Sequence, residues 1–311
     1  MKKLNVLAFL TCVACGVACA QVKNPTTTEK WPQPGQPQEW RGEVPVYKVT
    51  VIGKDIPAIN YFHRSGATKI GFQGTSLLPK GRGEATVESR KGRMVIDAKL
   101  EGLVPANGFG VEYLTYVLWA ITPDGRPVNL GEVLPDGSKA EITVTTDLQA
   151  YGLIITAEPY YAVTMPSDLV VLQNYVLPGE TEGILEQVNA HYSLLPRGAY
   201  GETAGEHTVT NNLITRDDQS PLELYEAINA VQIAEAEGAG RYSPETLATA
   251  KQDLQNAQAM DTHKSERKQE ISYAREAVQT AEDARIMTVR KMRNNAERKQ
   301  QSAQAQVPQG S

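Results

Sequence analysis

The chain has 311 residues, of which 41% are hydrophobic, 22% charged and 6% aromatic. This length suffices for two domains with buried cores. The formal charge of −5 at pH 7 gives no global attraction to nucleic acid, so we expect no nucleic-acid partner. With only four histidines and three cysteines, the chain has little material for transition-metal or thiol chemistry, and we expect no cofactor.

The first twenty residues have the three parts of a secretory signal peptide. Lys2 and Lys3 give a positive start, an apolar stretch runs from Leu4 to Gly16, and Ala18-Cys19-Ala20 has the small-residue pattern of a cleavage site. Cleavage after Ala20 would remove every cysteine. No later segment approaches the roughly 18–20 apolar residues of a membrane helix. We therefore expect an exported protein, periplasmic or associated with the outer membrane, without a transmembrane span in the mature chain.

A lipoprotein signal is the alternative interpretation of this segment. Gly16-Val17-Ala18-Cys19 is similar to a lipobox, although Gly16 stands where leucine is usual. Cys19 would then be the lipid-modified first residue. Residues 21–44 are rich in Pro, Gln and Thr, and we expect them to form a disordered stalk, because this composition buries too little apolar area to offset backbone entropy.

Residues 45–180 show repeated period-2 apolar alternation separated by turn residues, which is typical of short strands. The predicted strands are Val46–Ile52, Ala58–Phe62, Thr68–Phe72, Ala85–Ser89, Met94–Leu100, Tyr113–Thr122, Val128–Val133, Ala140–Thr145, Gly152–Ala157 and Leu169–Tyr175. With no long helical pattern between them, these strands indicate a sandwich or barrel rather than a parallel α/β sheet. We expect an antiparallel β-sandwich.

Two turn motifs suggest how part of this domain is connected. Thr122-Pro123-Asp124-Gly125 and Leu134-Pro135-Asp136-Gly137 each lie between predicted strands. Together they predict that Tyr113–Thr145 is a three-stranded antiparallel meander. In its first strand both alternating sets of residues are apolar, which predicts a strand buried on both faces.

The run Tyr116–Gly131, continued by Ile155–Pro159, resembles the extracytoplasmic β-sandwich domain of anti-sigma factors of the anti-sigma-K type. This resemblance covers a short central part of the chain and implies the sandwich fold. We find no counterpart of the family's cytoplasmic sigma-binding part and membrane helix, so we do not carry over the regulatory role.

Residues 220–300 have the pattern of three amphipathic helices joined by short links, after a polar connector over 181–219. Ser220-Pro221-Leu222-Glu223 predicts a helix start with Ser as N-cap and Glu closing a capping box. Gly238-Ala239-Gly240 predicts its end, and Tyr242-Ser243-Pro244-Glu245 begins the next helix. The third runs from about Ser265 to Gln300, and its apolar stripe is mostly alanine. We expect a helical hairpin or three-helix bundle.

The alanine spacing and the Gly-Ala to Tyr-Ser-Pro link resemble an uncharacterised helical domain of bacterial envelope lipoproteins. In that family the domain often precedes an outer-membrane-protein-A-like module that binds peptidoglycan. Here we expect residues 301–311 to be a disordered tail, too short for such a module. Envelope proteins or peptidoglycan are the partners this resemblance implies, with self-association through the helices.

The end of the third predicted helix is basic. Five cationic residues stand against Glu297, namely Arg290, Lys291, Arg293, Arg298 and Lys299. They are candidates for contact with an anionic surface such as lipid headgroups or wall phosphates. The alternative is a solvated helix end whose cations complement the helix dipole.

No catalytic constellation is evident. The four histidines, at positions 63, 191, 207 and 263, have no metal-binding spacing, and there is no nucleophile elbow, phosphate loop or calcium loop. We therefore expect a non-enzymatic envelope protein with a structural or assembly role and a β-sandwich recognition domain. One alternative is a glycan- or protein-binding module that acts through the sandwich loops. Exposure of Phe109, Tyr160 and Tyr161 on one loop face would favour this alternative, and their burial would weaken it. Another alternative is a hydrolase. Glycoside hydrolysis needs two carboxylates at a set separation, and this separation depends on the fold and not on the sequence spacing.

The intact mass of the exported protein tests the two interpretations of the N-terminus. Plain cleavage predicts a chain that starts at Gln21 and carries no modification. A mass raised by acyl chains, with Cys19 retained as first residue, would establish the lipoprotein interpretation instead.

Overall fold

The computed structural model describes residues 52–61, 66–181, 184–185, 190–194, 219–261 and 266–305. The predicted signal peptide, Cys19 and the stalk lie outside these residues, as do His63, His207 and His263. The described strands and helices belong to one compact unit.

The described strands follow the predicted positions closely from Ala58 to Tyr175. They are β1 (Ile52–Ile56), β2 (Ile59–Asn60), β3 (Ala67–Gly74), β4 (Arg82–Arg90), β5 (Arg93–Glu101), β6 (Thr115–Ile121), β7 (Pro127–Val133), β8 (Lys139–Thr146), β9 (Ala150–Glu158), β10 (Val170–Tyr175), β11 (Ile184–Leu185) and β12 (Ala190–Leu194). A short 3-10 helix, η1 (Ala106–Phe109), precedes β6. The last two strands fall in the segment expected to be a polar connector.

The pairing of the described strands is antiparallel throughout. β9 is central: one of its edges pairs with β6, and the other pairs first with β2 and then with β10. The sheet continues from β10 through β3, β4 and β5 to β8, while β7 extends it beyond β6. β1 and β12 form a separate two-stranded sheet.

The large sheet curls into an almost closed barrel. Its terminal strands approach each other, since Gly131 of β7 lies against the side chains of Ile142 and Val144 of β8. A two-sheet sandwich is therefore not confirmed: one continuous sheet encloses the core instead of two stacked sheets. The coarser expectation, an antiparallel β region followed by helices, is confirmed.

The predicted meander is right in its first half and wrong in its second. β6 and β7 form the expected hairpin, with Gly125 at φ +82° in the turn. β8, however, pairs with β5 along its whole length. The backbone carbonyl of Ser138 accepts a bond from the amide of Leu103 just after β5, which turns the chain toward that strand.

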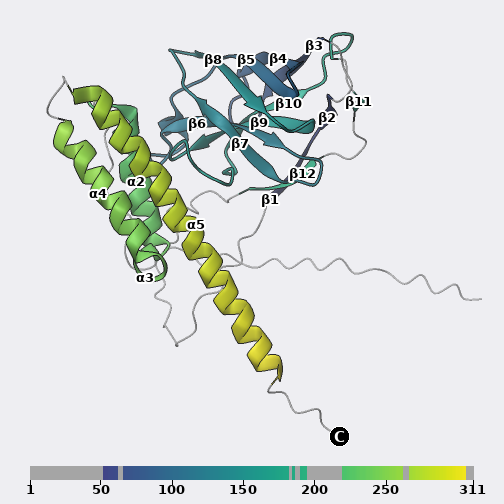
Figure 1. Cartoon of the computed structure of the whole chain (residues 1–311). Helices are drawn as coiled ribbons and strands as arrows, with labels where there is room; N and C mark the ends of the chain where they lie inside the picture. The colour runs from purple at the N-terminus through teal and green to yellow at the C-terminus, as the bar shows by residue number, and fades with distance from the viewer. Residues whose placement is uncertain are drawn as a thin grey trace, which may run out of the picture. The chain divides into compact units, whose positions relative to one another are not determined.

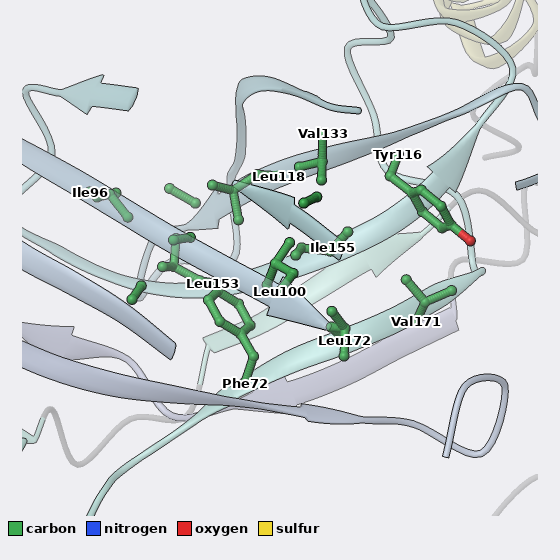
Figure 2. Packing of buried hydrophobic residues seen from close by; sticks show 14 of the residues in the cluster. Phe72, Ile96, Leu100, Tyr116, Leu118, Val133, Leu153, Ile155, Val171 and Leu172 are labelled. Atoms are coloured by element: carbon green, nitrogen blue, oxygen red, sulfur yellow. The ribbon is translucent and has the colours of Figure 1, made fainter. Parts of the chain in front are cut away.

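The interior of the barrel is filled by alternate residues of successive strands (Figure 2). Phe72, Ile96, Leu118, Leu153 and Ile155 converge there and are almost fully buried. Each such side chain contributes about 1.5–3 kcal/mol on transfer from water. The outward residues of β4, β5 and β8 are mostly charged or polar, so this part of the sheet faces solvent.

β6 is buried on both faces, as predicted. Tyr116, Leu118 and Ala120 belong to the barrel core. Val117, Trp119 and Ile121 point outward and pack with the helices in a second hydrophobic cluster.

Figure 1 shows the helices α2 (Leu222–Ala236), α3 (Ala239–Tyr242), α4 (Pro244–Met260) and α5 (Arg267–Ala305), with α5 alongside α2 and α4. The predicted alanine stripe is confirmed. Ala274, Ala277, Ala281 and Ala284 of α5 are fully buried. Gly238, at φ +92°, follows the end of α2 as expected from the Gly-Ala-Gly motif.

The predicted helix starts have different outcomes. α4 begins as expected, with Ser243 as N-cap and Pro244 in the first turn. The capping box predicted for α2 is wrong, because Pro221 occupies the N-cap position. Ser220 donates instead to the Asp261 carboxylate at 2.9 Å, and Glu223 pairs with Arg275.

Leu118→Ala should lower the free energy of unfolding by about 2–5 kcal/mol, because it leaves a cavity in the barrel core. Leu134→Ala is the matched control: this side chain is 51% exposed, and its loss should change stability by less than about 0.5 kcal/mol. Denaturant unfolding of both variants measures the difference. Equal effects would contradict the assignment of Leu118 to the core.

Candidate functional site at the interface between the sheet and the helices

The largest concentration of buried polar side chains lies where the helices cover the outer face of β6 and β9. The surrounding apolar cluster contains Trp119 and Ile154 from the sheet and Val231 and Val278 from the helices. Buried polar groups lose their water, so each needs a partner within the protein. The partners define three groups of residues at this interface.

The first group centres on Glu282 of α5. Its carboxylate receives a forked interaction from Arg285, with Nε to Oε2 at 2.6 Å and an Nη to Oε1 at 2.8 Å. The Tyr160 hydroxyl donates to Oε2 at 2.7 Å, and the amide and hydroxyl of Thr164 donate to Oε1 at 3.1 and 2.6 Å. Burial raises the pKa of Tyr160 well above its ordinary value, so the hydroxyl keeps its proton and donates. The group fixes α5 to the loop that follows β9.

The second group is a set of carboxyl groups around Arg275 of α5. The guanidinium lies 3.3 Å from a carboxylate oxygen of Glu132 in β7 and 3.4 Å from one of Glu223 in α2. It also lies over the ring of Tyr161, 4.9 Å from the centroid. Thr115 donates to Glu132 at 2.8 Å. Burial raises the pKa of Glu132 despite these stabilising contacts, and it raises that of its neighbour Glu226 much further.

The third group lies along the sheet itself. The indole of Trp119 donates to the Thr156 hydroxyl at 2.8 Å, and that hydroxyl donates to the Glu158 carboxylate. The same carboxylate accepts the amide of Ser167 at 2.7 Å. These bonds satisfy polar atoms on a buried strand and hold the loop between β9 and β10.

Neutral contacts complete the docking of the helices. The Asn229 amide of α2 donates to the carbonyls of Glu112 and Pro159 at 3.0 and 3.3 Å. The Tyr161 hydroxyl donates to the carbonyl of Arg275 at 3.0 Å. Geometrically, these arrangements suit the fixation of helices on a sheet. The carboxylates of Glu132, Glu158 and Glu282 each accept hydrogen bonds from protein groups.

A further carboxyl cluster lies inside the helical region. Arg267 bridges Glu270 at 2.9 Å and Asp261 at 3.5 Å. Glu270 is fully buried, and burial, followed by the nearby Asp261, raises its pKa to about 7. The cluster joins the end of α4 to the beginning of α5.

The predicted basic residues lie in the last part of α5, and all five are exposed. Ser243, just before α4, bonds the Ala284 carbonyl and the Thr288 hydroxyl at 2.7 and 2.8 Å. The start of α4 therefore lies beside Ala284 and Thr288 of α5. The part of α5 that follows these residues continues past the start of α4. Lys291 donates to the Tyr242 carbonyl, and Arg298 to the side chain of Asn295. Their role in contact with an anionic surface stays a prediction.

The aromatic loop face that would favour a binding module is not formed. Tyr160 is fully buried and bonded to Glu282, while Phe109 packs edge-on to Tyr116 at 6.4 Å. Tyr161 is half-buried under Arg275. These three residues therefore do not make an exposed stacking platform.

Among the residues that the structure describes, no three His, Cys, Asp or Glu side chains gather in a way that could hold a metal ion. Over the same part of the chain, no helix combines the length and apolar character needed to cross a membrane. No protein-family model and no curated protein matches the chain.

The sequence named Tyr160 and Tyr161 but not their partners at the interface, because no local motif connects the residues that meet there. Tyr160 and Glu282 are 122 positions apart. One signal was available: polar residues within strongly apolar patterns, such as Glu226 between Tyr225 and Ala227 in α2, indicate a partner on another element.

Glu282→Gln should lower stability by about 3–5 kcal/mol, because it removes the carboxylate that makes a forked ion pair with the buried Arg285. Tyr160→Phe removes one hydrogen bond and should cost about 1 kcal/mol. Glu276→Gln, at an exposed position of the same helix, is the control and should change stability by less than about 0.5 kcal/mol. Denaturant unfolding gives the three values. A Glu282 variant as stable as the control would show that the ion pair does not fix the interface.

Proposed function

We propose that this chain is an exported, non-enzymatic protein of the cell envelope that acts as a structural or assembly element. The observation that supports this most directly is the interface just described. The ion pair between Arg275 and Glu132 and the hydrogen bonds from Tyr160 and Asn229 join the helices to the barrel and its loops, and they support one relative placement of the two parts. If the sheet and the helices keep one relative placement, a recognition surface on one of them is held at a defined distance from an anchoring surface on the other.

The N-terminal sequence supports the location. Lys2, Lys3, the apolar stretch and Ala18-Cys19-Ala20 together have the composition of an export signal. Whether Cys19 is removed or lipidated decides if the anchor is covalent.

The basic end of α5 supports the nature of the partner. Arg290, Lys291, Arg293, Arg298 and Lys299 are exposed and stand against a single acidic residue of the same segment, Glu297. An exposed positive segment on a chain of net negative charge attracts anionic polymers at short range, and the attraction weakens as salt increases. We infer that the partner is the peptidoglycan layer with its anionic polymers, or an acidic envelope protein.

Co-sedimentation of the purified protein with isolated peptidoglycan sacculi, over a salt titration, tests this function. We expect saturable, salt-sensitive binding by the wild type and a large loss of binding when the five basic residues are changed to Gln. The control variant carries the same charge change on the solvent-facing sheet, with Lys80, Arg82, Lys91, Arg93 and Lys99 changed to Gln.

Two results would contradict the proposal. Failure of the wild type to sediment with sacculi at low salt would exclude the wall as its partner. If both variants lose binding equally, net charge rather than the α5 segment controls it.

A further inference from the structure

Glu226 of α2 occupies an unusual position for a carboxyl group. Its side chain is fully buried, and no N–H or hydroxyl group of the described residues donates to its carboxyl oxygens. The Arg275 guanidinium lies 3.3 Å from Glu132 of β7 and 3.4 Å from Glu223, which precedes Glu226 by three residues on α2. This cluster brings α2 to β7, and Glu226 interacts there with Glu132. Two carboxylates in such contact repel each other, whereas a carboxyl and a carboxylate can share a hydrogen bond through one proton.

The surrounding groups leave this repulsion uncompensated at Glu226. Arg275 of α5 pairs with Glu132 and Glu223 and is 42% exposed, so solvent weakens its field. Glu223 of α2 adds a further negative charge. Tyr161, from the loop after β9, contributes a hydroxyl that donates elsewhere, to the Arg275 carbonyl. Thr115 of β6 donates to Glu132, which favours Glu132 as the ionised member of the pair.

We propose that Glu226 and Glu132 form a proton-dependent latch, in which one shared proton holds α2 against β7 and its loss loosens the helices from the sheet. The latch depends only on residues of this interface. It goes beyond the proposed envelope function and does not depend on where in the cell the protein acts.

The sign of the pH dependence follows from proton binding. Burial, and then the charge of Glu132, raises the pKa of Glu226 in the docked state well above its ordinary value of 4.5. The docked state therefore binds more protons than the undocked state above pH 4.5. The full stabilisation by the latch is present below that pH and is lost as pH rises through the docked pKa. Within this window the equilibrium constant for undocking increases by up to about tenfold per pH unit for one proton.

Hydrogen exchange of the α2 amides between pH 5 and pH 8, corrected for intrinsic rates, measures this opening locally. In the wild type, protection of Leu224–Ala234 should fall as pH rises. Glu226→Gln keeps the shape and a hydrogen-bond donor for Glu132 but cannot lose a proton. This variant should have higher protection than the wild type at pH 8 and little pH dependence. Glu235→Gln, on the exposed side of α2, is the matched control and should behave like the wild type.

A second variant keeps the test decisive if Glu226→Gln folds poorly. Glu132→Gln removes the neighbouring negative charge and leaves the titrating carboxyl in place, so the fall in protection should end at a lower pH and be smaller than in the wild type. Glu237 and Glu270 also have raised pKa values, and global unfolding should therefore retain some pH dependence in both variants. Identical α2 exchange profiles for the wild type and Glu226→Gln, or for the wild type and Glu132→Gln, would overturn the latch.

Discussion

The burial of β6 and β9 on both faces is the constraint on which the other features depend. A barrel needs apolar residues only on its inner face, yet Val117, Trp119 and Ile121 add an apolar stripe outside. Exposure of such a stripe to water is unfavourable, so another element must cover it. α2 and α5 provide the cover. The helices are therefore part of the packing of the sheet, and the polar groups of the interface have to be accommodated within that packing.

Apolar contact alone would allow several placements of a smooth helix on a sheet. The bonds of Glu282 remove this freedom, because two carboxylate oxygens must meet Arg285, Tyr160 and Thr164 together. A buried ion pair adds little net stability, since desolvation offsets much of the attraction. This ion pair lies within α5 and holds the Glu282 carboxylate in one orientation. The directional bonds that Tyr160 and Thr164 donate to that carboxylate then set where α5 lies relative to the loop after β9. We interpret the polar groups as the source of specificity and the apolar groups as the source of stability.

The sequence was sufficient to predict most strands and helices, but it was insufficient to predict which residues distant in the chain are partners. Period-2 alternation gave the strands, and the two apolar faces of Tyr116–Ile121 gave the double burial. The partner of β8 could not be predicted, because the turn before it suits either a hairpin or a crossing to β5. Ser220 was misassigned because Asp261, 41 positions later, binds its hydroxyl. The pairing of Glu226 with Glu132 likewise depends on two elements that only the fold brings together.

The alanine stripe of α5 explains why docking matters for the helices themselves. Ala277 and Ala281 allow neighbouring helices to approach closely, but each buries little apolar area. Larger side chains of α2, among them Leu224 and Val231, belong to the cluster shared with the sheet. Much of the apolar area that stabilises α2 therefore depends on contact with β6 and β9. A change in the charge of Glu226 acts on this contact, so its effect should extend along α2 rather than remain at one side chain.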